Sequence, residues 1–430
     1  MSPFEHLLKS VVLPPLFSVR QRFPDDALAD VALSVTRSLD QSGLAERLTG
    51  GHIAIGVGSR GIANLGIIVR AVVDWFRQHG STPFVFPAMG SHGGATAEGQ
   101  RDVLAHLGIT EASAGCPIRS TMDTVYVGTL DNGLPVHLDR FAARADGIFM
   151  INRIKPHTGF SGQHESGLVK MAVIGLGKQR GAEACHHFGY AHMAENLTRA
   201  CALLLERCPQ VLGGLGIVEN AYDKTCHVEA VPRETFFVRD SALLHLARER
   251  MGRLYVRQLD VLILQRMGKE ISGAGMDPNI IGRAASPYKR GEIDCTKIGV
   301  LRLTDASQGN ACGVGIADVI PQRLFDEIDP FATYTNVMTS TMLRAAHIPV
   351  VMPTERDAIR CLVKTSNPQS DGVRLTFLRD TLSLEDIWVS EPVARELARN
   401  QLCDVDMTPH SFVFDGHGVC TTPSWQKQTL

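Results

Sequence analysis

Histidines are concentrated in one glycine-rich part of the chain. The string KPHTGFSG at 155–162 contains His157, and the string CHHFG at 185–189 contains His186 and His187. Imidazoles, with an ordinary pKa of about 6.5, accept and return protons near neutral pH. No histidine pair has the HExxH spacing of a zinc protease, but one or two of these rings could bind a softer divalent metal such as nickel. The alternative is that the paired histidines simply lie at the start of a helix.

Another histidine lies in a glycine-rich turn directly after a predicted strand. The string MGSHGGATAEG at 89–99 contains Ser91, His92, Gly93 and Gly94. Glycines allow the backbone to approach a ligand closely. Because open α/β sheets bind ligands at the carboxyl ends of their strands, we expect His92 to project toward a ligand. A purely structural histidine is the alternative.

A third glycine-rich turn, GVGSRG at 56–61, has the GxGxxG spacing of a dinucleotide-binding fingerprint. Two features favour an anion-binding turn instead. The next strand ends in PAM at 87–89, where a dinucleotide site normally has an acidic residue. Arg60 lies inside the turn, where its guanidinium would meet an anion directly. A nicotinamide site and a structural tight turn are the other interpretations.

A long polar loop in the second half of the chain adds two more cations. The string MGKEISGAGMDPN at 267–279 follows a predicted strand and contains Lys269, and Arg283 comes soon after it. Either side chain could pair with a carboxylate, the arginine through a bidentate fork. A solvated loop is the alternative interpretation.

The elements that must position these residues alternate between strands and helices. Short runs rich in β-branched residues are separated by longer helical patterns, which predicts an α/β fold with mostly parallel sheets. The predicted strands are 52–56, 84–88, 124–128, 147–152, 213–220, 261–265, 297–303 and 349–353. We expect two α/β domains, 1–254 and 255–430, with the first binding the cofactor and the second closing an interdomain cleft.

Composition limits the function classes. The 430 residues carry a formal net charge of −2, which argues against the basic field of a nucleic-acid-binding protein. No secretory signal or membrane-spanning run is visible, so we expect a cytoplasmic protein with no membrane partner. The ten cysteines show no CxxC pair, which fits reduced thiols better than a zinc site or a disulfide framework.

Taken in order, these stretches resemble the nickel-dependent lactate racemase family, whose members carry a nickel-pincer nucleotide. The strings AMGSHGGATAEG at 88–99 and KPHTGFSG at 155–162 are similar to the family's two catalytic-histidine turns. The similarity continues through Lys170 to His186 and extends more loosely over the second half of the chain. The joint spacing is far more specific than any single motif.

The resemblance implies roles for individual residues. His92 and His157 would be the acid/base pair, His186 the nickel ligand, and Lys170 the lysine that tethers the cofactor. Ser91, Gly93 and Gly94 would line the cofactor, and Arg60, Lys269 and Arg283 would bind the substrate. His164 and His187 remain in reserve.

This chain also departs from the family pattern. Val57 replaces the usual aspartate three residues before the arginine, and Gly162-Gln163-His164 replaces a glycine pair, with a longer segment before Lys170. Covalent attachment at Lys170 therefore has two alternatives, which are Lys178 and a cofactor held without a covalent bond.

The expected activity is racemisation or epimerisation of a small 2-hydroxy acid by hydride transfer to the nucleotide, through a 2-oxo acid intermediate. Direct removal of the Cα proton is difficult beside a carboxylate, and oxidation followed by hydride return avoids that carbanion. Two bases are required because each enantiomer presents its hydroxyl from a different side. The alternatives are an oxidoreductase that releases the 2-oxo acid and a non-catalytic protein that binds a small carboxylate or nucleotide.

Overall fold

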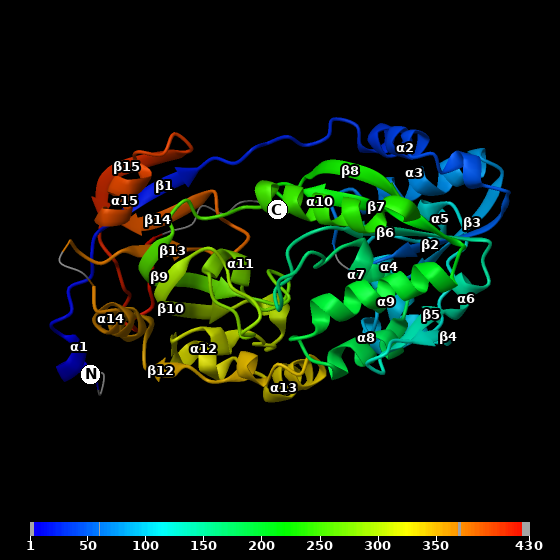
Figure 1. Cartoon of the computed structure of the whole chain (residues 1–430). Coiled ribbons are helices and arrows are strands. Elements are labelled where there is room, and N and C mark those ends of the chain that lie inside the picture. Colours follow the sequence, from blue (N-terminus) through cyan, green and yellow to red (C-terminus); the bar gives the residue numbers. More distant parts are fainter. Residues whose placement is uncertain (1–3, 60, 369–370, 424–430) are drawn as a thin grey trace. The chain divides into compact units, whose positions relative to one another are not determined.

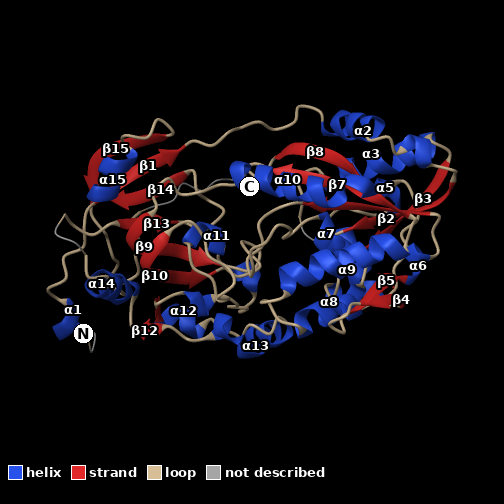
Figure 2. Cartoon of the chain, in the orientation of Figure 1, coloured by secondary structure: helices blue, strands red, loops and turns tan. Residues whose placement is uncertain are grey.

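The computed structural model describes residues 4–59, 61–368 and 371–423. The chain forms two compact units, one of Pro24–Met251 and the other of Met1–Phe23 together with Gly252–Leu430. Each contains a largely parallel sheet with helices beside it (Figures 1 and 2). The expected α/β fold class is confirmed.

The unit of residues 24–251 is built on a five-stranded sheet of order β3-β2-β6-β7-β8. Neighbouring strands are parallel except for the β7–β8 hairpin. The strands are β2 (Gly51–Val57), β3 (Ser81–Pro87), β6 (Gly147–Arg153), β7 (Val211–Glu219) and β8 (Thr225–Pro232). A separate antiparallel pair consists of β4 (Thr124–Thr129) and β5 (Pro135–Asp139). The helices of this unit are α2 (Val31–Gln41), α3 (Leu65–Gln78), α4 (Ala97–His106), α5 (Glu111–Ala114), α6 (Arg140–Ala143), α7 (Leu168–Lys170), α8 (Lys178–His187), α9 (Met193–Arg207) and α10 (Phe236–Arg250).

Both faces of this sheet are buried, as a parallel sheet requires. Alternate residues of each strand enter different cores: Phe149 and Ile151 of β6 pack with α2 and α3, whereas Ile148 and Met150 pack with α7, α9 and α10. The core that contains Ile148 and Met150 therefore includes the helices that surround the histidine-rich segment, residues 155–189.

Three loops leave the carboxyl ends of adjacent strands. Strand β2 lies between β3 and β6, with Ile55 opposite Val85 on one side and Phe149 on the other. The segments that follow these strands, 58–64, 88–96 and 154–167, consequently start at one edge of the sheet. Open α/β sheets bind ligands at this edge.

The second unit contains an eight-stranded sheet of order β12-β11-β10-β9-β13-β14-β1-β15. Its strands are β1 (Leu16–Gln21), β9 (Gln258–Met267), β10 (Asp294–Leu303), β11 (Val319–Pro321), β12 (Val350–Met352), β13 (Leu375–Leu378), β14 (Asp386–Ser390) and β15 (Cys403–His410). The helices are α1 (Glu5–Leu8), α11 (Pro278–Ile281), α12 (Gln322–Asp326), α13 (Pro330–Thr339), α14 (Glu355–Thr365) and α15 (Glu391–Leu397).

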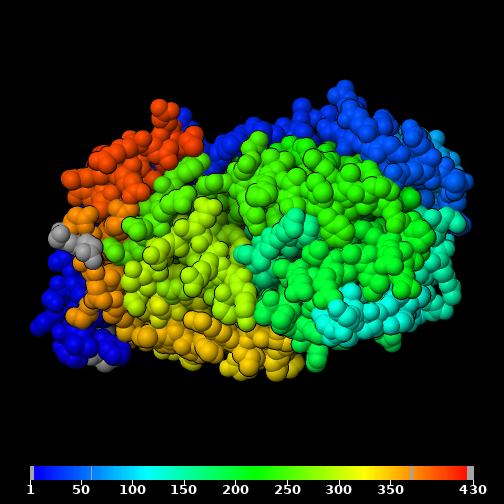
Figure 3. Space-filling view, in the orientation of Figure 1, coloured from blue at the N-terminus to red at the C-terminus, as the bar shows by residue number. Residues whose placement is uncertain are grey.

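The first residues of the chain belong to this second unit, which differs from the expected domain of residues 1–254. Strand β1 pairs antiparallel with β14 and β15, and its Leu16 and Val19 are buried. Helix α1 packs against α14, and the two lie side by side at the surface in Figure 3. A strand whose partners lie more than 350 positions away in sequence leaves no local signal of where it pairs. The expected boundary at 254 lies close to the observed division at Gly252.

Candidate active site

The turn after β2 does not have the geometry of a dinucleotide fingerprint. Helix α3 starts at Leu65, and Asn64 before it has a left-handed backbone. A side chain added at Gly61 would meet open space, whereas the third glycine of a fingerprint is needed for close packing of helix on strand. This geometry disfavours the nicotinamide interpretation. Arg60, which was expected to bind substrate, lies outside the described residues.

The turn after β3 holds His92 at the protein surface. The Nδ1 atom of His92 is hydrogen bonded to the hydroxyl of Ser59, which follows β2. Gly93 has a φ of +65°, and a Cβ there would lie 2.5 Å from the backbone of Gly99, so no other residue fits. The tight turn thus leaves His92 exposed at the sheet edge.

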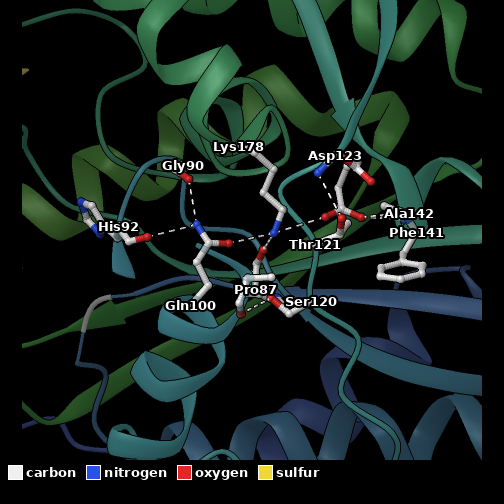
Figure 4. Close-up of polar contacts among 12 residues, drawn as sticks. Pro87, Gly90, His92, Gln100, Ser120, Thr121, Asp123, Phe141, Ala142 and Lys178 are labelled. Atoms are coloured by element: carbon white, nitrogen blue, oxygen red, sulfur yellow. Dashed lines mark hydrogen bonds and ion pairs between the residues drawn. The ribbon is translucent and has the colours of Figure 1, made fainter. Parts of the chain in front are cut away.

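A buried polar network supports this turn from below (Figure 4). The side-chain amide of Gln100 donates to the carbonyl oxygens of Gly90 and His92, at 2.8 and 3.2 Å. Its oxygen accepts from the ammonium of Lys178 at 2.9 Å. Because an ammonium can only donate, Lys178 fixes which end of the Gln100 amide faces the turn.

Lys178 itself is completely buried, and its ammonium is engaged by protein groups. It donates to the carbonyl oxygen of Pro87 and forms an ion pair with Asp139 at 3.2 Å. Burial lowers the pKa of Lys178 and raises the pKa of Asp139, and each charge opposes the shift of the other. The geometry therefore favours a structural role for Lys178 over its expected role as a cofactor ligand.

The loop after β6 holds His157. Lys155 and Ser166 pair across the base of the loop through two backbone hydrogen bonds. The backbone N–H of His157 donates to the buried carboxylate of Glu165 at 2.6 Å, and the N–H of Gly159 donates to His157 Nδ1 at 2.9 Å. Because a backbone N–H can only donate, Nδ1 accepts, and the neutral ring carries its proton on Nε2.

Tyr190 connects the two parts of the histidine-rich segment. Its ring centroid lies 6.4 Å from that of His157 and 5.8 Å from that of His186. Phe160 also stacks near His157, with ring centroids 4.4 Å apart. A Cβ at Gly159 would lie 2.4 Å from the Tyr190 ring, so the glycine permits this close contact. The structure thus brings His157 and His186 to one aromatic residue.

His186 presents a neutral nitrogen donor. Its Nδ1 is buried and has no hydrogen-bond partner among the described residues. Burial, with a smaller contribution from the charge of Lys170, lowers the pKa of His186 to about 4, so the ring is neutral at pH 7. Burial also raises the pKa of the neighbouring Cys185 to about 12, which leaves it a thiol. The imidazole, not the thiol, is therefore the available metal ligand here.

Comparison with known proteins identifies this region. Residues 36–197 match the family described as the lactate racemase N-terminal domain. This segment is similar to the lactate racemase N-terminal domain. It includes His92, His157, Lys170 and His186, and it confirms the resemblance to the lactate racemase family.

A solved structure supports the fold. The lactate racemase apoprotein from Thermoanaerobacterium thermosaccharolyticum aligns with a TM-score of 0.54 at 15% identity, over 85% of this chain and 99% of that chain. A protein from Thermotoga maritima aligns with a TM-score of 0.45 at 14% identity, over 64% of this chain and 71% of that one. No curated protein sequence matches. No helix of the described chain has both the length and the apolar character needed to cross a membrane.

The other predicted site residues fall in two places. Ser91, Gly93 and Gly94 lie with His92 in one turn of the segment that matches the lactate racemase N-terminal domain. Lys269 and Arg283 belong to the second unit. The Lys269 ammonium donates to Gly273 O and Asn336 Oδ1, at 2.7 and 2.9 Å.

Arg283 is occupied by its own unit. It pairs with Asp318 at 2.7 Å and donates to three backbone carbonyl oxygens, those of Cys295, Thr296 and Ile316. These contacts favour a structural role over the expected substrate contact.

Several residues of the site escaped prediction from sequence. They are Ser59, Gln100, Glu165, Tyr190 and Asp240, and each touches a predicted residue or the loop that carries it. Tyr190 could have been suspected from its place one residue after CHHFG. Gln100 and Asp240 offered no signal, because polar residues within a helical pattern normally face solvent.

Proposed function

We propose that this protein is a racemase or epimerase of a small 2-hydroxy acid that uses a nickel-pincer nucleotide. The observation that carries the proposal is His186, a neutral imidazole whose buried Nδ1 has no partner among the described residues and which lies in the segment that matches the lactate racemase N-terminal domain. The family indicates racemase or epimerase chemistry. The 2-hydroxy acid substrate and the nickel nucleotide are further parts of our proposal.

The donor set fits such a group. Among the described residues, no three His, Cys, Asp or Glu side chains gather to hold a metal ion alone. A nucleotide that brings its own sulfur donors needs only one protein ligand, and His186 can supply it. Lys170, whose charge acts on the His186 ring, would bind the nucleotide covalently or by charge. Ser91, Gly93 and Gly94 would line it. When bound, the group supplies an acceptor for the Cα hydride and returns that hydride.

The protein's own histidines would move the hydroxyl proton. Ser59 can donate or accept, so it supports either tautomer of His92 and leaves Nε2 for proton exchange. His157 presents an N–H at Nε2 in its neutral form, which can hydrogen bond to the oxygen of the 2-oxo acid. To transfer that proton the ring must also be protonated at Nδ1, because a neutral imidazole would otherwise become an imidazolate. Taking up a proton at Nε2 requires His157 to give up the bond from Gly159. His92 follows strand β3 and His157 follows strand β6. Two bases from different loops suit a reaction that must exchange the proton at two faces of the substrate.

The substrate carboxylate needs a cation. We propose Arg60 for this role, because it directly follows Ser59, the hydrogen-bond partner of His92, in the sequence. The engaged guanidinium of Arg283 makes it a weaker candidate, and Lys269 remains a second one.

The test is to produce the protein together with the cofactor-making enzymes and nickel, and then to incubate it with a panel of single-enantiomer 2-hydroxy acids. We expect one nickel per chain, a mass increase from a nucleotide, and formation of the opposite enantiomer or epimer. Stoichiometric accumulation of a 2-oxo acid with an electron acceptor would assign an oxidoreductase instead. A clean apoprotein mass after co-production would count against the cofactor.

A further inference from the structure

Glu165 is a fully buried carboxylate beside the proposed acid/base histidine. Its side chain is 0% exposed. Oε2 accepts from the backbone N–H of His157 at 2.6 Å, and Oε1 accepts from the N–H of Gly162 at 3.1 Å. These two donors lie on either side of the loop tip. The carboxylate therefore ties the tip together from inside.

Helix α10 supplies the compensating charge. Arg248, near the end of α10, donates to Glu165 Oε1 at 2.6 Å and is 38% exposed. A buried carboxylate is stable only when it is paired and hydrogen bonded, and this arrangement provides both. The position of His157 thus depends on a helix that lies some 80 residues further along the chain.

The same helix makes a second contact of opposite polarity. Asp240 of α10 is buried and pairs with His164 Nδ1 at 2.9 Å. Its other oxygen accepts from the backbone N–H of Leu168 at 2.7 Å, at the start of the short helix that ends in Lys170. In one contact the carboxylate belongs to the loop (Glu165) and the cation to the helix. In the other contact the carboxylate belongs to the helix (Asp240). Two buried polar side chains of the loop, His164 and Glu165, are thus both paired with residues of α10.

We propose that Glu165 is a positioning residue, held by Arg248, that sets the place of the His157 ring for proton exchange. The proposal rests on the proposed function for the role of His157, but the anchoring itself can be measured without any activity. Glu165 acts through the backbone of His157 and has no assigned contact with substrate or cofactor.

The decisive variant is Glu165→Gln. An amide has one acceptor oxygen, and its NH2 end would face one of the three donors that the carboxylate now satisfies. In the metal-free protein we expect amide exchange at His157 and Gly162 to be about tenfold faster or more, because charge-assisted hydrogen bonds are lost. In the loaded enzyme we expect kcat to fall by about tenfold with KM unchanged, because substrate binding does not require the exact ring position whereas proton transfer does.

Arginine variants keep the proposal testable if Glu165→Gln does not fold. Arg248→Met leaves the two backbone donors in place and should raise exchange about threefold, whereas Arg248→Lys keeps the charge and should stay within about twofold of wild type. Arg239→Met is the matched control, because Arg239 is also on α10 and pairs with a glutamate, Glu229 on β8, at 2.5 and 2.7 Å. It should leave the exchange of residues 155–167 unchanged.

Two outcomes would overturn the inference. One is unchanged exchange at His157 and Gly162 in both Glu165→Gln and Arg248→Met. The other is a loosened loop with wild-type kcat in an active enzyme, which would make the anchor purely structural. Absence of racemase activity in wild-type protein would count against the proposed function, and the exchange measurement would still decide the anchoring.

Discussion

The two histidine-bearing segments are held in opposite ways. The turn of residues 89–96 is anchored through backbone carbonyl oxygens, which accept from the neutral amide of Gln100. The loop of residues 155–167 is anchored through backbone N–H groups, which donate to the charged Glu165. Each arrangement satisfies buried backbone groups that the regular sheet no longer pairs.

The supporting charges also differ in their exposure. Lys178 and Asp139, which complete the first anchor, are both 0% exposed, whereas Arg248 is 38% exposed. The first anchor is therefore part of the core and the second is open to solvent on one side. Damage to the first anchor should therefore lower the stability of the whole unit, whereas damage to the second should act on the local loop.

The largest expected effect would show whether the two histidines act as a pair. His92→Ala and His157→Ala should each lower racemisation by about 10²- to 10⁴-fold, the usual contribution of a general acid/base. Nickel content should stay at the wild-type level, because His186 is unchanged. The measurement is chiral chromatography of the product together with metal analysis. Full activity in the double variant would sink both role assignments.

The second prediction separates the two anchors by stability. Lys178→Met should lower the free energy of unfolding by about 3–5 kcal/mol, because it leaves the buried Asp139 uncompensated. Arg248→Met should cost only about 1–2 kcal/mol, because Arg248 is 38% exposed, so solvent already screens its ion pair and water can take the place of its guanidinium beside Glu165. Urea unfolding of both variants gives the comparison. Equal losses would show that the two anchors do not differ as proposed.

The third prediction concerns His186, whose buried Nδ1 has no hydrogen-bond partner among the residues that the structure describes. Its pKa of about 4 in the folded protein lies below the ordinary 6.5, so between these values the unfolded chain binds more protons. Stability should therefore rise with pH in this window, and acidification from pH 7 to pH 5 should remove about 1–2 kcal/mol through this ring. Urea unfolding of metal-free wild type and His186→Gln at both pH values tests this. An identical pH dependence in the two proteins would contradict the shifted pKa.

Much of the fold could be predicted from sequence because its signals are local. Each predicted strand overlaps an observed strand, since a short continuous apolar run such as 147–152 is itself a local signal of a buried strand. The glycines around His92 likewise marked a tight turn, and Gly93 has the positive φ that the pattern implies. The histidines could be found because they lie in such turns.

The supporting residues could not be predicted, because their partners are distant in sequence. Glu165 meets Arg248 across 83 positions, and Lys178 meets Gln100 across 78. From sequence alone, a lysine near glycines resembles a ligand for an anion. Only the structure shows that Lys178 is buried and supports the turn that carries His92 through Gln100. The same reason explains the misplacement of residues 1–23, whose strand β1 pairs with β14 and β15 at the other end of the chain.

The smallest expected effect distinguishes the two rings themselves. Ser59→Ala removes the partner of His92 Nδ1 and should lower kcat by less than about tenfold, the range of one hydrogen bond. Nitrogen-15 NMR at neutral pH should show a changed tautomer ratio for His92 and, for His157, a proton on Nε2 in both proteins. A proton on Nδ1 of His157 in the wild type would remove the difference between the rings.

If the difference holds, His92 accepts a proton without losing its partner, whereas His157 must release Gly159, so the two directions of the reaction should differ in kcat. Because mirror-image substrates have equal energies, that difference must be matched by one in KM, which gives the comparison a second, independent measurement.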